Sequence, residues 1–315
     1  MNRDIIIGID TSNYTTSVAL MYADGELIAN IKRPLPVKAG ECGLRQSDAV
    51  FAHVKNIPSA MQEAREILGG RAPRAVGVST RPRNIDGSYM PCFLSGVSVA
   101  ESISATLGIP LYRYSHQCGH VMAAIYSSGR FDLLKKEHFC AFHVSGGTTE
   151  VLRVSPTDTA FLAELVGGTK DLNAGQVIDR IGVFMGLPFP CGAHIEELAL
   201  KNTAKIPSKK ISISDLSVNL SGLENMAKDL YEKTGDKSLT SAFVLDYVGK
   251  SLAALASAYE ERFGETEFIF AGGVMSNSII KGMLKKDFNA SFAEPSLSSD
   301  NAVGIAALTA REYTK

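Results

Sequence analysis

Two histidines spaced four positions apart carry the clearest chemical signal in the chain. His116 and His120 belong to the stretch Tyr-Ser-His-Gln-Cys-Gly-His of residues 114–120. On a helix, side chains at i and i+4 lie on one face, so the two imidazoles can share a metal ion. Zinc proteolysis would need a general-base glutamate directly after the first histidine, and Gln117 stands there. We therefore exclude a zinc protease, while packing or capping remains the alternative to a metal for this pair.

An aspartate near the end of the sequence is a candidate third ligand. Asp300 follows Ser298 and Ser299, either of which we expect to cap a helix whose first turn holds the aspartate. Capping alone would explain this pattern. A carboxylate that joins two imidazoles is also a common mixed ligand set for one divalent ion such as iron or zinc. On that hypothesis His116, His120 and Asp300 converge on a single ion.

Small residues at the tips of strand-like runs could hold the phosphates of a nucleotide. The apolar run of residues 139–145 leads into Gly146 and Gly147. The run of residues 4–10 leads into the polar turn Asp-Thr-Ser-Asn-Tyr-Thr-Thr of residues 10–16. Small residues at such tips let backbone amides approach an anion. A glycine pair in isolation is more often only a turn, but two such turns facing each other would hold phosphates between two lobes.

A second glycine pair follows the apolar run of residues 267–271. Gly272 and Gly273 could pack flat against an adenine or ribose, with Asn277 near the next helix start to hydrogen-bond it. A tight strand-to-helix connection explains the same pattern equally well. Further back, Asp179 lies on a helical stretch whose small residues would allow it close to the same ligand.

The elements that position these residues alternate between strands and helices. Strand-turn-strand patterns cover residues 4–32 and recur at residues 139–155, which predicts a duplicated fold. Residues 201–221 are polar and predict an exposed excursion. Helical periodicity indicates the stretches 47–68 (interrupted by Pro58), 95–107, 116–125, 239–263 and a helix from Ser278.

Composition limits the class of protein. The chain has 315 residues, 45% hydrophobic and 21% charged, which is typical of a globular protein with room for two lobes. Its 32 basic and 33 acidic side chains give a net charge of −1, which argues against a non-specific nucleic-acid coat. The five cysteines are scattered, and we find neither a secretory signal nor an apolar run of transmembrane length. These features predict reduced thiols, a cytoplasmic location and no membrane association.

Taken in order, these motifs resemble the tRNA N6-threonylcarbamoyladenosine synthase family, once called O-sialoglycoprotein endopeptidases. The resemblance covers nearly the whole chain and implies the two-lobed α/β architecture of the actin-like ATPases, which include sugar kinases and Hsp70. It places the metal ligands of the family on His116, His120 and Asp300, and a family tripeptide on residues 221–223. The nucleotide or substrate contacts of the family fall on His143, Val144, Ser145, Gly146, Gly147, Asp179, Gly192 and Asn277, with a candidate phosphate turn at Asp10, Thr11 and Ser12.

The resemblance also implies an activity. The family transfers a threonylcarbamoyl group from an adenylate to an adenosine of tRNA, so ATP or an adenylate, one divalent metal ion and tRNA are expected ligands. A paralogous subunit of the same fold is a further expected partner. No catalytic residue is assigned. We expect an N-terminal lobe of residues 1–121, to which residues 299–315 return, and a C-terminal lobe of residues 122–298, each a mixed sheet flanked by helices.

The chain departs from the family pattern around the expected reaction centre. The family's Cys, Asp and Glu in the first turn are replaced by Asn13, Tyr14 and Thr15, and a family histidine is replaced by Thr148. Leu172 and Gln176 likewise replace an aspartate and a glutamate. Residues 81–85 read Arg-Pro-Arg-Asn-Ile where the family has Pro-Gly-Pro-Gly-Leu. We interpret the chain as a divergent paralogue in which the metal and nucleotide positions survive.

Three other functions remain open on this reading. Carbamoyl transfer to a small molecule is modestly favoured by the near-neutral charge and the lost acids, and tRNA binding would separate it from tRNA modification. A catalytically weak scaffold that binds a partner is disfavoured, because a scaffold needs no metal ligands. A sugar or acetate kinase would need a catalytic base over its acceptor and no metal-binding histidine pair.

Overall fold

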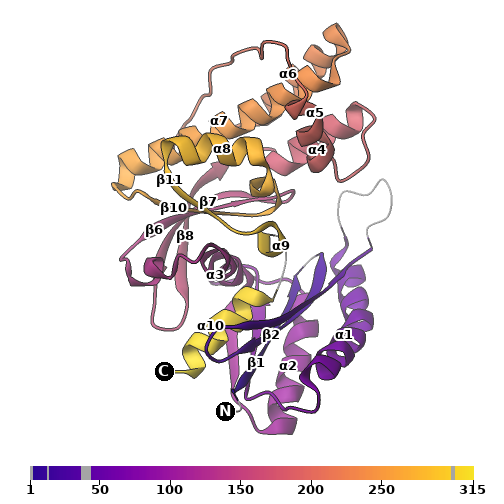
Figure 1. Cartoon of the computed structure of the whole chain (residues 1–315), viewed down its shortest axis with the longest axis vertical. Helices are drawn as coiled ribbons and strands as arrows, with labels where there is room; N and C mark the ends of the chain where they lie inside the picture. Colours follow the sequence, from indigo (N-terminus) through magenta and orange to yellow (C-terminus); the bar gives the residue numbers. More distant parts are fainter. Residues whose placement is uncertain (1–2, 13, 37–43, 299–301) are drawn as a thin grey trace. The chain divides into compact units, whose positions relative to one another are not determined.

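The computed structural model describes residues 3–12, 14–36, 44–298 and 302–315 (Figure 1). The chain forms two units, one of Met1–Phe131, Pro156–Ala163 and Ser299–Lys315 and the other of Asp132–Ser155 and Glu164–Ser298. The first unit therefore extends ten residues beyond the boundary at 121 that we expected. The reason is that helix α3 (His116–Ser128) packs along the last helix, α10 (Val303–Tyr313), and stays with the first unit.

The first unit contains a five-stranded sheet in the order β3-β2-β1-β4-β5. Its antiparallel meander consists of β1 (Ile5–Ser12), β2 (Thr15–Tyr22) and β3 (Leu27–Pro34). Strand β4 (Ala75–Arg81) pairs in parallel with β1, and β5 (Leu111–Ser115) pairs in parallel with β4. The carboxyl ends of β1, β4 and β5 therefore meet at one edge of this sheet.

The second unit repeats this topology. Its sheet has the order β11-β10-β6-β7-β8-β9, so β8-β7-β6-β10-β11 corresponds strand by strand to β3-β2-β1-β4-β5. As in the first unit, the central strand has an antiparallel neighbour on one side and a parallel neighbour on the other. The duplicated fold predicted from the sequence is confirmed. The strands are β6 (Phe139–Val144), β7 (Thr149–Pro156), β8 (Phe161–Thr169), β9 (Ser217–Val218), β10 (Glu267–Ala271) and β11 (Asn289–Phe292).

Helices cover both faces of the first sheet. Alternate residues of β1 (Ile5, Ile7 and Ile9) pack with α1 (Gln46–Leu68) and α2 (Phe93–Leu107). The α10 helix lies against the opposite face. Helix α1 runs through Pro58 without interruption, so the expected break there is wrong. A proline inside a helix costs about 3 kcal/mol, and the packing of the apolar side of α1 against the sheet offsets that cost.

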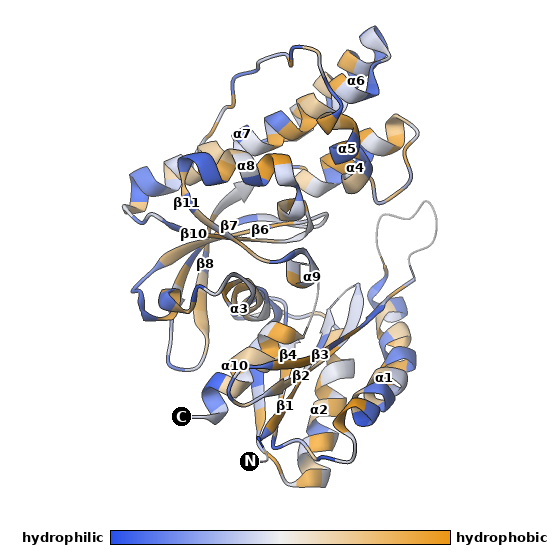
Figure 2. Cartoon of the chain, in the orientation of Figure 1, coloured by the Kyte–Doolittle hydropathy of each residue, from blue (hydrophilic) through white to orange (hydrophobic). Residues whose placement is uncertain are grey.

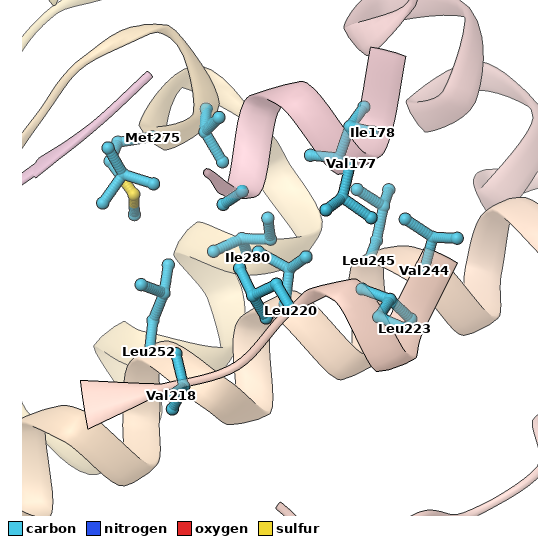
Figure 3. Packing of buried hydrophobic residues seen from close by; sticks show 14 of the residues in the cluster. Val177, Ile178, Val218, Leu220, Leu223, Val244, Leu245, Leu252, Met275 and Ile280 are labelled. Carbon is cyan, nitrogen blue, oxygen red and sulfur yellow. The ribbon is translucent and has the colours of Figure 1, made fainter. Parts of the chain in front are cut away.

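A long helix forms the centre of the second unit. Helix α7 (Lys237–Phe263) packs Val244, Leu245 and Leu252 into a buried cluster with side chains of the other helices (Figure 3). By length and composition alone it could cross a membrane, but 72% of its apolar window is buried inside the protein. The helices around it show an apolar side and a hydrophilic side (Figure 2). They are α4 (Ala174–Phe184), α5 (Gly192–Leu200), α6 (Ser221–Thr234) and α8 (Ser278–Asp287).

Two local expectations need correction. Most of the polar segment of residues 201–221 is irregular and exposed, yet Leu216, Val218 and Leu220 are buried because β9 adds to the sheet edge. The last helix begins at Val303 with Ala302 at its cap position. Ser298 does not cap it, because Ser298 ends the short helix α9 (Pro295–Ser298) and its hydroxyl donates to the Ala293 and Glu294 carbonyls just before that helix. Ser299, the other expected cap, lies outside the described residues.

The contact between α10 and α3 depends on two glycines. A Cβ added at Gly304 would lie 1.8 Å from the carbonyl oxygen of Gly119 and 2.9 Å from the amide nitrogen of Ala123. No side chain fits at such distances. The absence of a Cβ on Gly304 therefore lets the two helix backbones approach closely.

We expect Gly304→Ala to destabilise the protein by about 1–3 kcal/mol, the range for an overpacked core. The matched control is Gly282→Ala in α8, where an added Cβ meets nothing within 4 Å. Alanine at such an exposed helix position should stabilise by up to about 1 kcal/mol because of its better helix propensity. Urea denaturation of both variants measures the difference. Equal stability of the two variants would contradict the close approach.

Candidate functional site

An acid and two histidines meet at the carboxyl edge of the first sheet. Asp10 lies near the end of β1 and is fully buried, and His116 and His120 lie on the first turns of α3. Helix α3 begins directly after β5, and the Ser115 hydroxyl caps it by accepting a hydrogen bond from the Cys118 amide at 3.2 Å. The cap fixes the first turn of the helix and with it the position of His116.

Hydrogen bonds fix the orientation of both imidazoles. The Nδ1 atom of His116 lies 2.8 Å from Oδ1 of Asp10. The Nε2 atoms of His116 and His120 lie 2.9 Å apart. Because an ionised carboxylate only accepts, His116 carries a proton on Nδ1 and directs its Nε2 atom toward His120. Carboxylate–histidine pairs of this kind orient metal ligands and raise their basicity.

This arrangement fits a shared metal ion. Two nitrogens that lie about 2.1 Å from one ion are about 3 Å apart at the right angle of octahedral coordination and about 3.4 Å apart at a tetrahedral angle. The observed separation of 2.9 Å, which is also that of a hydrogen bond, is closer to the octahedral value. Among the described residues no group of three His, Cys, Asp or Glu side chains could hold an ion. Asp300, the predicted third ligand, lies outside the described residues, so the convergence of the three remains a prediction.

The predicted phosphate turn is shorter than expected. Asp10, Thr11 and Ser12 lie in β1, paired with residues of β2, because that strand begins as early as Thr15. The expectation of a polar turn from residue 10 to residue 16 is therefore wrong. The hydroxyl of Thr11 donates to the Cys92 carbonyl at 3.0 Å and accepts from the Gly96 amide at 3.1 Å, which joins β1 to α2.

A buried histidine that the sequence analysis did not single out supports this hairpin. His53 of α1 has no exposed surface, and its Nε2 lies 2.8 Å from the carbonyl oxygen of Ser12. A carbonyl only accepts, so Nε2 carries the proton and Nδ1 accepts from the Thr16 hydroxyl at 2.8 Å. The amide of Asn56 also donates to that hydroxyl at 3.4 Å. One side chain of α1 thus holds both strands at the hairpin end.

In the second unit, the loop between β6 and β7 lies against the start of α4. The Ser145 amide donates to the Thr148 carbonyl at 2.7 Å, which closes the turn. A Cβ added at Gly175 would lie 2.7 Å from the Ser145 carbonyl oxygen and the Gly146 amide, so only glycine permits this contact. Gly146 and Gly147 have open space where a side chain would lie. The backbone of this loop is therefore accessible to a ligand.

The third predicted turn lies beside this loop. Strands β6 and β10 are parallel, with Ala271 opposite His143, so both end at one edge. Gly272 has φ +100°, and a Cβ there would lie 2.2 Å from the Val144 carbonyl oxygen. Asn277 caps α8, because its Oδ1 accepts from the Ile279 and Ile280 amides, both at 3.1 Å. This turn is thus the tight strand-to-helix connection that the sequence also allowed. The Asn277 amide group remains available for a ligand.

Asp179 and Gly192 also serve the local structure. Oδ1 of Asp179 accepts from the Cys191 amide at 2.7 Å, directly before α5 begins at Gly192. Burial raises the pKa of Asp179 above its ordinary value, and that hydrogen bond opposes the rise. An added Cβ at Gly192 meets nothing within 4 Å. A nearby residue that the sequence analysis missed is Glu196, whose Oε1 accepts from the Ser278 amide at 2.7 Å and joins α5 to α8.

A second missed acid organises the end of β8. Partial burial would raise the pKa of Asp171, but hydrogen bonds from the Ser221 hydroxyl and from three backbone amides outweigh it and hold the pKa at about 2. Two of those amides belong to Leu220 and Ser221, at the start of α6. Asp171 therefore anchors the family tripeptide of residues 221–223. The position of this Asp shortly before a helix could have revealed its role in the sequence.

Comparison with known proteins supports the family resemblance. A family model described as tRNA N6-adenosine threonylcarbamoyltransferase (TsaD) matches residues 38–307. The chain is 30% identical to the enzyme of that name from Streptococcus suis (strain 05ZYH33), over 100% of this chain and 94% of the relative. It is 27% identical to the one from Syntrophomonas wolfei, over 98% of this chain and 92% of the relative.

Solved structures with low sequence identity show the fold. HypF of T. kodakarensis has a TM-score of 0.63 at 12% identity, over 99% of this chain and 48% of that one. Component A of the (R)-2-hydroxyglutaryl-CoA dehydratase of Acidaminococcus fermentans has a TM-score of 0.55 at 14% identity, over 99% and 100%. A glucokinase from Streptomyces griseus has a TM-score of 0.52 at 14% identity, over 97% and 99%. The predicted actin-like ATPase fold is confirmed.

We expect Asp10→Ala to weaken binding of a divalent ion by about tenfold to a hundredfold, the usual effect of removing the carboxylate partner of a ligating histidine. The physical reason is that His116 then loses the acceptor that keeps its proton on Nδ1. Titration of the metal-free protein with Co²⁺, followed by its visible absorption, measures the affinity. The control Asp48→Ala removes an exposed acid from α1 and should leave the affinity unchanged. Unchanged affinity in Asp10→Ala would contradict the orienting role.

Proposed function

The chain belongs to the tRNA N6-adenosine threonylcarbamoyltransferase family, and from that premise we propose that it transfers a threonylcarbamoyl group from an adenylate to the N6 amine of an adenosine in tRNA. The observation that carries the proposal is the His116–His120 pair, whose Nε2 atoms lie 2.9 Å apart with His116 oriented by Asp10. A carboxylate bonded to the other ring nitrogen is the arrangement that typically orients a metal-ligating histidine.

The proposed reaction forms one bond and breaks one bond at the carbamoyl carbon. The N6 nitrogen attacks the carbamoyl carbon, and the bond from that carbon to the phosphate oxygen breaks. AMP leaves with the electron pair, and the amine loses one proton. No covalent intermediate with a side chain is required, so positioning and charge stabilisation can supply the catalysis.

We propose that the first unit holds one divalent ion, iron or zinc, through His116, His120 and Asp300. Such an ion supplies Lewis-acid polarisation of a carbonyl or phosphoryl oxygen. The described backbone next to Asp300 is consistent with this assignment. An added Cβ at Gly8 of β1 would lie 2.7 Å from the Ala302 carbonyl oxygen, so Ala302, two residues after Asp300 in the sequence, lies close to the strand that carries Asp10.

We further propose that the second unit binds the nucleotide of the donor. The backbone of Gly146 and Gly147 would bind phosphate oxygens, since neither position carries a side chain that blocks approach. A phosphate oxygen would there replace the Ser145 hydroxyl, to which the Gly147 amide donates at 3.3 Å. Asn277 uses its carbonyl oxygen to cap α8, which orients its amide group as a donor to the nucleoside. His143, Val144, Asp179 and Gly192 would shape the remainder of this site.

Gly147→Leu should abolish ATP binding while the protein remains folded. An added side chain at Gly147 meets no protein atom within 4 Å of its Cβ, so its bulk would occupy only the space we assign to the phosphates. Isothermal calorimetry with ATP measures binding, and thermal unfolding checks the fold. Gly282→Leu, also in open space but on α8, is the control and should bind ATP normally. Normal ATP binding by Gly147→Leu would show that the glycine only makes a turn.

The purified chain alone should modify unmodified tRNA at least about tenfold more slowly than the Streptococcus suis relative assayed beside it. Each lost charge contact costs about 1–3 kcal/mol, or roughly tenfold to over a hundredfold in rate. Tyr14, Thr15, Leu172 and Gln176 stand where the family has acids. The assay supplies threonylcarbamoyl-adenylate and tRNA and measures the modified nucleoside by mass spectrometry.

Three outcomes are distinguishable in this assay. Slow modification supports both the activity and the role of the lost acids. Modification as fast as that of the relative would contradict that role and leave the activity intact. Consumption of the adenylate with a small-molecule acceptor, and none with tRNA, would replace the proposal by small-molecule carbamoyl transfer.

A further inference from the structure

An arginine lies at the same edge of the first sheet as the histidine pair. Arg81 ends β4, and its Cα is the register partner of Ser115, the residue directly before His116. The register of β4 and β5 shifts between Ser79 and Arg81, so one extra residue is inserted at the end of β4. Insertions of this kind change the direction of the following side chains and are frequent beside active sites.

The loop that begins at Arg81 is fixed to the first turn of α3. The Gln117 amide donates to the Pro82 carbonyl at 3.0 Å. Within the loop, the Arg83 amide donates to the Ser88 hydroxyl at 3.0 Å, and Nη2 of Arg81 donates to Oδ1 of Asn84. These bonds hold the guanidinium in one place relative to α3.

The guanidinium of Arg81 is only partly satisfied. Its Nε is buried and has no hydrogen-bond partner among the described residues. No carboxylate of the described residues forms an ion pair with the Arg81 guanidinium. Arginine remains protonated at all relevant pH values, so a buried N–H of this group without an acceptor is costly. The site thus has a donor and a positive charge ready for an anion.

Two geometric observations place Arg81 next to the first turn of α3, which carries His116. They are the register of Arg81 with Ser115 and the hydrogen bond from the Gln117 amide to the Pro82 carbonyl.

We propose that Arg81 is a specificity-determining residue that binds the carboxylate of the threonyl group next to His116 and His120. This inference rests on the proposed function, in which the donor carries two anionic groups. Of these two groups the carboxylate is the one assigned to Arg81, and the binding of AMP tests the phosphate as the alternative. A planar guanidinium matches a carboxylate with two parallel hydrogen bonds.

Two small ligands test this directly. N-carbamoyl-L-threonine carries the carboxylate, and N-carbamoyl-L-threoninamide replaces it by a neutral amide of nearly the same shape. NMR titration of the wild-type protein should show the acid binding at least about tenfold tighter than the amide. Arg81→Gln should weaken acid binding by about tenfold to a hundredfold and leave amide binding unchanged. Arg81→Lys, which keeps the charge but loses the planar fork, should lie between the two.

Controls separate this effect from general loss of charge. Arg113→Gln removes an arginine of β5 that is exposed and paired with Glu101, and it should not change either affinity. AMP supplies the phosphate arm, and its binding should be the same in Arg81→Gln and in the wild type. Weaker AMP binding with unchanged acid binding in Arg81→Gln would overturn the proposal, because the anion would then be the phosphate.

The comparison of acid and amide binding in the wild-type protein does not depend on whether any variant folds. Equal affinity for the acid and the amide, or no binding of either, would overturn the inference whether or not Arg81→Gln folds. Failure of the proposed function has a different signature. A wild-type chain that discriminates the acid from the amide through Arg81 but never modifies tRNA would contradict the proposed function and retain the carboxylate site.

Discussion

The close approach of α10 to α3 is the constraint on which the first site depends. Gly304 and Gly119 let the two helix backbones touch, and Gly8 lets α10 reach the sheet at β1. The last helix of the chain is thereby held between the strand that carries Asp10 and the helix that carries the histidines. A side chain at Gly304 or Gly8 would meet backbone atoms, move α10 away and change the spacing of the elements around His116.

The same strand arrangement then explains why each unit has a candidate site at one edge. In each sheet the central strand has an antiparallel hairpin partner on one side and a parallel strand on the other. Hairpin tips and the carboxyl ends of parallel strands therefore occur together. Asp10 and His116 gather there in the first unit, and Ser145 with Gly272 in the second. Open α/β sheets commonly bind ligands at such edges.

How much the sequence could predict depended on the range of the interaction. Apolar periodicity and glycine turns gave the strands, helices and duplication, because these depend on neighbours in the chain. The spacing of His116 and His120 gave the paired imidazoles for the same reason. The hydrogen bond between Asp10 and His116 joins residues 106 positions apart, and no local sequence pattern predicts it. His53 was missed similarly, since a histidine on an apolar helix face gives no sign of the two strands it will join.

At some positions where the chain departs from the family pattern, apolar packing takes the place of a charged group. Leu172, where the family has an acid, packs against the hydrophobic cluster of the second unit, whereas the adjacent Asp171 keeps its carboxylate because backbone amides bind it. Asp10 and Asp179 are also bound within the protein, to His116 and to the Cys191 amide. Each of these three retained acids thus has a hydrogen-bond partner within the protein. Tyr14, by contrast, is 42% exposed at the tip of its hairpin, where the fold requires no charge, so the replacement of an acid there costs the fold nothing.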